Sequence, residues 1–247
     1  MVYLKRSFYI LSLSIFILCA ESANAYIPQR GNVTAYLGPY WFKTNYDGVR
    51  SEDNQANVGA ALIASGDVSD KGALELGTIF MNKYYFREEG AYSIAERTQT
   101  LHITIAYRRY WAPSFSTSLG LYTSYPMGDV KTIHDDYPTD WDKDTSAHST
   151  TESGLDFALQ GEVWTSGLWS VMAEARYSYA ITKKAHEYSD QYAYMIALKY
   201  FIQARVENPK TLKEIPPKPP ELKTETETKQ DKTPPTSKSP PKPKNLK

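Results

Sequence analysis

Three aspartates at alternate positions, in the run Asp140-Trp-Asp142-Lys-Asp144, come closest to a metal-binding spacing. Alternating carboxylates open the calcium loop of EF-hands, because hard cations prefer oxygen ligands. The match then fails, since Thr145 stands where that loop needs glycine and Thr151 stands where it needs glutamate. We therefore expect a solvated acidic loop, with weak calcium or magnesium binding at Asp140, Asp142 and Asp144 as the alternative.

A second set of charged residues alternates with apolar residues along several segments. Alternation places such residues on one face of a strand. If that face lines the interior of a small barrel, the charges must pair, because an unpaired buried charge costs several kcal/mol. We expect these side chains to plug the barrel interior, with a narrow ion path as the alternative. Whether Arg108 and Arg176 contact Glu162 and Glu174 is left open by the sequence. The set comprises Glu75, Lys83, Arg108, Asp156, Glu162, Glu174, Arg176 and Lys199.

The histidines give no recognisable chemistry. No two of them lie two or four residues apart, so no metal-binding pair is visible. A Ser–His–acid relay needs its three groups within hydrogen-bond reach. His148 with Ser149 in the acidic loop, and His102 beside Thr104, do not form such a motif. We expect no enzyme, no catalytic residue and no cofactor.

The elements that must hold these residues are eight strand-like segments between residues 26 and 202. Their apolar residues recur with a period of two, most clearly over residues 191–201. No segment keeps a period of 3.6, so we expect essentially no helix. Each strand is long enough to cross a bilayer when tilted. The segments are 32–43, 55–66, 73–86, 98–111, 115–127, 152–165, 168–181 and 190–202.

Long polar connections and short turns alternate along this series. The long connections are 44–54, 87–97, 128–151 and 182–189, and the short turns are 67–72, 112–114 and 166–167. Such alternation is typical of barrels with short periplasmic turns and long external loops. It also sorts the aromatic residues into two girdles. The loop-end girdle is Trp41, Tyr84, Phe86, Tyr125, Tyr177, Tyr179, Tyr192 and Tyr194; the turn-end girdle is Tyr107, Trp111, Phe115, Trp164, Trp169 and Tyr200.

Both ends of the chain have their own composition. Residues 1–25 combine Lys5 and Arg6, an apolar stretch and the site Ala23-Asn-Ala25, which predicts a signal peptide cleaved after Ala25. Residues 203–247 hold ten of the fifteen prolines and many lysines, which predicts a disordered tail. The tail is either a linker or a contact for peptidoglycan or a periplasmic protein. Formal net charge is zero, which gives no support for nucleic acid as a partner.

The export signal, the loop alternation, the girdles and a last strand ending Leu198-Lys-Tyr200-Phe201 resemble the small eight-stranded outer-membrane β-barrels of the OmpA-membrane-domain, OmpX and OmpW kind. The resemblance covers residues 26–202. It implies an all-β, eight-stranded antiparallel transmembrane up-and-down barrel in the outer membrane, with extracellular loops and a periplasmic tail.

The same resemblance implies a barrel-assembly signal in Leu198, Tyr200 and Phe201, read by the assembly machinery, and contact with outer-membrane lipid or lipopolysaccharide. It implies a structural, adhesive or loop-mediated binding role. A small pore is the alternative, and a lipid A-modifying enzyme is the second alternative. In OmpA-type proteins a folded peptidoglycan-binding domain follows the barrel, whereas here we expect only the tail, so an anchoring function does not transfer automatically.

Overall fold

The structure, a computed structural model, describes residues 26–202 apart from 49, 140, 142–143 and 149–150. The expected signal peptide and tail lie outside the described residues. Within the described part of the chain, no helix is long and apolar enough to cross a membrane. The strands are β1 (Val33–Thr44), β2 (Asn57–Ser69), β3 (Gly72–Glu89), β4 (Tyr92–Ala112), β5 (Phe115–Pro126), β6 (Lys131–Asp135), β7 (Glu152–Ser166), β8 (Trp169–Ala180), β9 (Glu187–Tyr188) and β10 (Gln191–Ile202).

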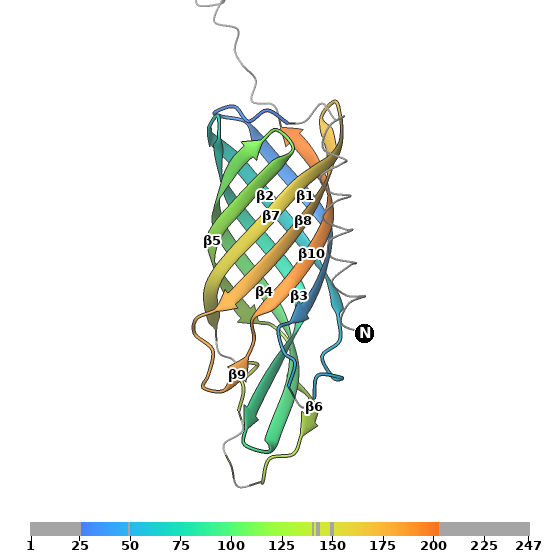
Figure 1. The fold of residues 1–247 in the computed structure, drawn as a ribbon, viewed down its shortest axis with the longest axis vertical. Coiled ribbons are helices and arrows are strands. Elements are labelled where there is room, and N and C mark those ends of the chain that lie inside the picture. The colour runs from blue at the N-terminus through green and yellow to red at the C-terminus, as the bar shows by residue number, and fades with distance from the viewer. Residues whose placement is uncertain (1–25, 49, 140, 142–143, 149–150, 203–247) are drawn as a thin grey trace, which may run out of the picture. The chain divides into compact units, whose positions relative to one another are not determined.

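Eight of these strands close into a barrel (Figure 1). Strands β1, β2, β3, β4, β5, β7, β8 and β10 pair antiparallel in that order, and β10 pairs back onto β1. The expected eight-stranded antiparallel up-and-down barrel is therefore confirmed. Because the wall closes on itself, its backbone groups are paired from strand to strand.

Strand β10 shows how the sequence sets the two faces of the wall. Buried and exposed residues alternate along it without interruption. Ile196 and Leu198 face outward, whereas Met195 and Lys199 are buried inside. Successive side chains of a strand point to opposite faces, so the period of two in the sequence becomes an outside and an inside.

The six aromatic residues of the expected turn-end girdle all lie on the outer wall, as the alternation predicted. The loop-end girdle is only partly correct. Tyr84 and Phe86 are buried, because they lie beyond the barrel and pack with Tyr46 of the first loop, whose ring stacks on Phe86 at 4.1 Å. The exposed aromatic residues at the two ends are Trp41, Tyr125, Tyr179, Tyr192 and Tyr194, and Tyr107, Trp111, Phe115, Trp164, Trp169 and Tyr200.

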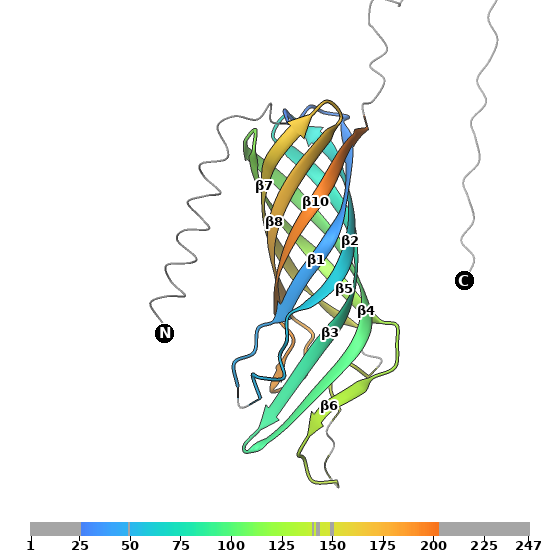
Figure 2. The same cartoon turned by 90° about the vertical axis from the view of Figure 1, so that its right-hand side faces the viewer.

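The prediction of a long loop over residues 87–97 is wrong. Strands β3 and β4 instead continue beyond the barrel as one hairpin, pairing as far as Glu89 with Tyr92 (Figure 2). The turn is tight because Gly90 adopts φ +65, a left-handed conformation that glycine reaches without steric cost. Strand β6 pairs with β4 on one side, and β9 pairs with β3 on the other. We call this four-stranded extension the outer sheet.

The pairing between β1 and β10 is interrupted near the middle of β1. The ladder between β1 and β10 runs from Val33–Ile202 to Leu37–Leu198 and resumes at Tyr40–Met195, skipping Gly38 and Pro39. Proline has no N–H to donate to the ladder. A Cβ atom on Gly38 would lie 2.3 Å from the carbonyl oxygen of Ile196, so the close approach of the two strands requires glycine here.

Candidate functional site

The barrel interior gathers the charged residues that the sequence placed on one face. Each of them comes from an inward position of its strand, and each side chain is nearly inaccessible to solvent. They reach the interior from different sides of the wall, so residues far apart in sequence meet there. The eight are Glu75 on β3, Lys83 on β3, Arg108 on β4, Asp156 and Glu162 on β7, Glu174 and Arg176 on β8, and Lys199 on β10.

Arg108 is the centre of this network. Its Nε donates to Glu75 at 2.6 Å, and its Nη2 donates to Glu174 at 2.9 Å. Its Nη1 donates to the Ser116 hydroxyl at 2.8 Å, and Nη2 also lies 3.4 Å from the Tyr36 hydroxyl. The guanidinium therefore joins β3, β8, β5 and β1 across the barrel.

Arg176 continues the network from the same glutamate. Its Nε and Nη2 donate to one oxygen of Glu174 at 3.0 and 2.8 Å, and its Nη1 donates to Asp156 at 2.9 Å. Glu174 thus accepts from both arginines. Alternating positive and negative groups extend without a break from Glu75 to Asp156.

Two further ion pairs lie toward the two ends of the barrel. Lys199 Nζ donates to Glu162 at 2.6 Å near the turns. Lys83 pairs with Glu152 near the loops, and the Tyr122 hydroxyl donates to the same Glu152 oxygen at 2.8 Å. The sequence analysis missed Glu152, although it is the first residue of β7 and lies on the same inward face of that strand as Asp156.

His102 lies between a hydroxyl and a carboxylate, an arrangement the sequence did not predict. Its Nδ1 is 3.0 Å from Ser124 Oγ, and its Nε2 is 3.0 Å from Asp156 Oδ2. The three groups stand in the order of a hydrolytic relay. However, Ser124 and His102 are each 0% exposed, and the ring of Tyr122 stacks on His102 at 4.3 Å. A substrate has no access to this serine.

Part of the acidic loop packs on the outer sheet. Thr145 and Ser146 are fully buried: Thr145 donates to Glu96 at 2.5 Å, and Ser146 Oγ donates to Glu187 at 2.8 Å. Arg87 donates to the carbonyl of Asp144 at 3.0 Å. We call residues 144–148 the docked segment. Burial raises the pKa of Glu187, although donation from Ser146 and from the Lys184 amide opposes that rise.

Most of the expected weak cation site at Asp140, Asp142 and Asp144 lies outside the described residues. Asp140 and Asp142 lie outside the described residues, and Asp144 pairs with Lys184 at 2.6 Å. Among the residues that are described, no group of three His, Cys, Asp or Glu side chains could hold a metal ion.

The three residues of the expected assembly signal lie on both faces of β10. Leu198 and Tyr200 are exposed on the outer wall, where Tyr200 lies 4.6 Å from Trp169. Phe201 instead points into the barrel mouth and is buried. Tyr200 is thus the terminal aromatic that faces outward.

A closed wall with apolar residues outside and paired charges inside inverts the usual distribution of a globular protein. This is the architecture of a small transmembrane β-barrel.

Comparison with known proteins gives structural matches only. No family model and no curated protein matches the chain. Ail, the attachment invasion locus protein of Yersinia pestis, solved with the heparin analogue sucrose octasulfate, is similar at 10% identity over 70% of this chain and 100% of that chain, with a TM-score of 0.43. OprG from Pseudomonas aeruginosa is similar at 12% identity over 74% of this chain and 100% of that chain, with a TM-score of 0.46. Neither match transfers a ligand to this chain.

Proposed function

We propose that the protein is an integral outer-membrane barrel that contacts its surroundings through its loops and holds a closed interior. The observation that carries the proposal is the outer wall. Leu37, Ile105, Leu121 and Ile196 are 59%, 63%, 65% and 57% exposed, although they lie mid-strand in a closed barrel. Water would disfavour such a surface, whereas lipid matches it.

Cell fractionation tests the location. The protein is expected in the outer-membrane fraction, with a gel mobility that shifts on boiling, and its purified form is expected to begin at Tyr26 if cleavage follows Ala25. A protein recovered in the soluble periplasm would overturn the proposal. A soluble barrel of lipocalin type would then be the better description.

The proposed closed interior rests on the ion-pair network. Charges buried between strands are held in fixed pairs, because separating them in a low-dielectric interior is costly. We expect purified protein in planar bilayers to give no discrete conductance steps. Reproducible steps that disappear on substitution of Arg176 would favour the small pore instead.

The proposed binding surface is the tip of the outer sheet. Tyr92, Tyr137 and Trp141 form an aromatic cluster there, with ring centroids 5.5 to 6.1 Å apart. Tyr92 and Trp141 are partly exposed, so their ring faces can stack on a ligand. Glycan and peptide arrays probed with protein in nanodiscs test this role. Binding should be lost in Trp141→Ser and retained in Trp111→Ser at the opposite end of the barrel.

Anionic headgroups are the proposed lipid partner. Two basic residues, Arg97 and Lys131, line a pocket of about 240 Å³ together with Asn82, Gln99 and one acidic residue, Asp129. Asn82 and Gln99 are one outward position beyond the lipid-facing Phe80 and Leu101, so the pocket lies at the outer rim of the apolar band. Arg97→Gln with Lys131→Gln should weaken association with lipopolysaccharide and leave association with zwitterionic phospholipid unchanged. Equal loss for both lipids would contradict the assignment.

The proposal does not include catalysis. The buried position of Ser124 argues against hydrolysis by the relay with His102 and Asp156. Lipid A masses from cells with and without the gene test the lipid A-modifying alternative. Unchanged masses are expected, and a mass difference restored by the wild-type gene alone would overturn this part of the proposal.

A further inference from the structure

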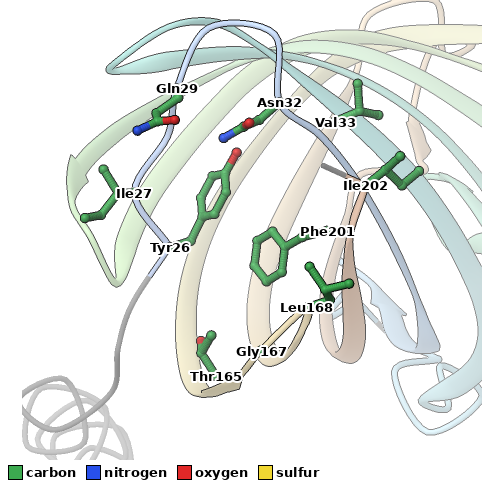
Figure 3. Close-up of a pocket in the computed structure, with 10 residues that line it drawn as sticks. All are labelled: Tyr26, Ile27, Gln29, Asn32, Val33, Thr165, Gly167, Leu168, Phe201 and Ile202. Carbon is green, nitrogen blue, oxygen red and sulfur yellow. The ribbon is translucent and has the colours of Figure 1, made fainter. Parts of the chain in front are cut away.

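Residue Tyr26, the first described residue, is buried at the turn end of the barrel. It lines a pocket of about 290 Å³. Figure 3 shows its ring facing Phe201. Its ring stacks on Phe201 with centroids 4.8 Å apart, and its hydroxyl donates to Asp67. Only 8% of the residue is exposed, although it would become the chain terminus after cleavage at Ala25. A new terminus is normally left in water.

The backbone nitrogen of Tyr26 is directed at a carboxylate. It lies 3.2 Å from Oε2 of Glu162, while the other oxygen of Glu162 accepts from Lys199 at 2.6 Å. Lys199 Nζ also lies 4.2 Å from the centre of the Tyr26 ring. Each oxygen of one buried carboxylate thus has its own nitrogen donor.

A cationic Tyr26 nitrogen would balance the charges of the ionised side chains at this end. Glu162 and Asp67 are the two buried acids beside Tyr26, and Lys199 is the buried base. Asp67 accepts from the Tyr26 hydroxyl and from the Gln29 amide at 2.9 Å, which are neutral donors. An ammonium group at Tyr26 would supply the second positive charge.

We propose that Glu162 and the surrounding pocket form a binding site for the α-ammonium group of the chain's own mature N-terminus. Hydrolysis of the Ala25–Tyr26 peptide bond by a signal peptidase consumes one water molecule. Ala25 leaves with a carboxylate, and Tyr26 gains a primary amine that is protonated near neutral pH. A neutral amide donor thereby becomes a charged one, and charge-assisted hydrogen bonds are stronger than neutral ones.

Processing then fixes the segment that follows. The Gly31 amide donates to the Asp67 carbonyl at 2.9 Å, and the Asp67 amide donates to the Asn32 carbonyl at 2.8 Å. With Tyr26 held at its other end, residues 26–32 are anchored across the turn end of the barrel. The inference rests on the proposed function, because it requires export and cleavage after Ala25.

The test compares two forms of the full mature chain, residues 26–247, refolded in lipid vesicles. One begins with Tyr26 and the other carries a Gly-Ser extension before Tyr26. We expect the authentic form to unfold about tenfold more slowly in urea, as a charged hydrogen bond replaces a neutral one. Its α-amine should also react more slowly with an amine-labelling reagent than the amine of the extended form. Equal unfolding and equal labelling of the two forms would overturn the inference.

A matched background separates charge from steric effects. Glu162→Gln alone leaves Lys199 unpaired and risks misfolding, so the background is Glu162→Gln with Lys199→Met. There the extension should no longer alter the unfolding rate. If the extension changes the unfolding rate equally in the wild-type protein and in the double variant, its effect is steric, and the proposed ion pair is refuted. Outer-membrane fractionation remains a separate test, so failure of this site is distinguishable from failure of the proposed function.

Discussion

Replacing Arg108 by methionine should destabilise the barrel more than any comparable change on its outer surface. The methionine keeps a long side chain but removes the four hydrogen bonds that Arg108 donates to Glu75, Glu174, Ser116 and Tyr36. Glu174 retains Arg176 as a partner. Glu75 retains only the Tyr36 hydroxyl, which donates at 2.6 Å, and so becomes a buried carboxylate without a cation.

The expected cost follows from that uncompensated charge. Breaking a buried ion pair by removing one partner costs about 3–5 kcal/mol, which is on the order of a hundredfold to several thousandfold in the folding equilibrium. Adding Glu75→Gln removes the stranded charge as well. The double variant should therefore recover about 1–3 kcal/mol relative to the sum of the single changes.

The assay is urea unfolding of protein refolded in lipid vesicles, followed by tryptophan fluorescence and by the folded band on gels. Arg109→Met is the matched control, because Arg109 is the next residue of β4 and is exposed. An Arg108→Met variant within about 0.5 kcal/mol of this control would refute the reasoning. So would strict additivity with Glu75→Gln, because it would show that the two groups do not interact.

Four further outcomes are expected. Because burial raises the Glu187 pKa, hydrogen-exchange protection of the docked segment should fall as pH rises above the ordinary value of 4.5. Glu187→Gln should abolish that pH dependence. A protection that falls as the pH is lowered would contradict the prediction. Gly38→Ala should cost about 1–3 kcal/mol in urea unfolding, whereas Gly66→Ala, which meets no atom within 4 Å, should be nearly neutral; equal effects would contradict the close approach. Lipids brominated near the headgroup should quench tryptophan fluorescence more than lipids brominated at the chain ends, and the reverse would contradict girdles that include Trp111, Trp164 and Trp169. A fluorophosphonate probe should leave the buried Ser124 of folded protein unlabelled, and labelling there would reopen hydrolysis.

The barrel was predictable because its determinants are local. Alternation along residues 191–201 assigns each side chain to a face without knowledge of its neighbours. The hairpin through Gly90 was not predicted, because the polar residues around it are equally typical of a loop. Tyr84 and Phe86 were misassigned for the same reason, since their burial depends on Tyr46 in a different loop.

The interior partners could not be predicted, because contact across a barrel depends on register and tilt. Sequence analysis left open whether Arg108 and Arg176 meet Glu162 and Glu174. In the structure both arginines reach Glu174, while Glu162 pairs with Lys199. The relay of Ser124, His102 and Asp156 was hidden similarly, as its members come from three strands. The alternation along each strand identifies which residues point inward, but the register between strands decides which of them are in contact.

The interrupted ladder between β1 and β10 has a consequence for the order of assembly. Strands β3 and β4 pair between neighbours in sequence, so their hairpin costs little loop-closure entropy and is expected early. Strands β1 and β10 lie at opposite ends of the barrel sequence, so we expect them to pair last. Their ladder skips Gly38 and Pro39, so the last seam to form also has a gap in its regular pairing. Folding is therefore expected to begin at the β3–β4 hairpin and to end with the pairing of β1 and β10. In denaturant, β1 and β10 are expected to separate first.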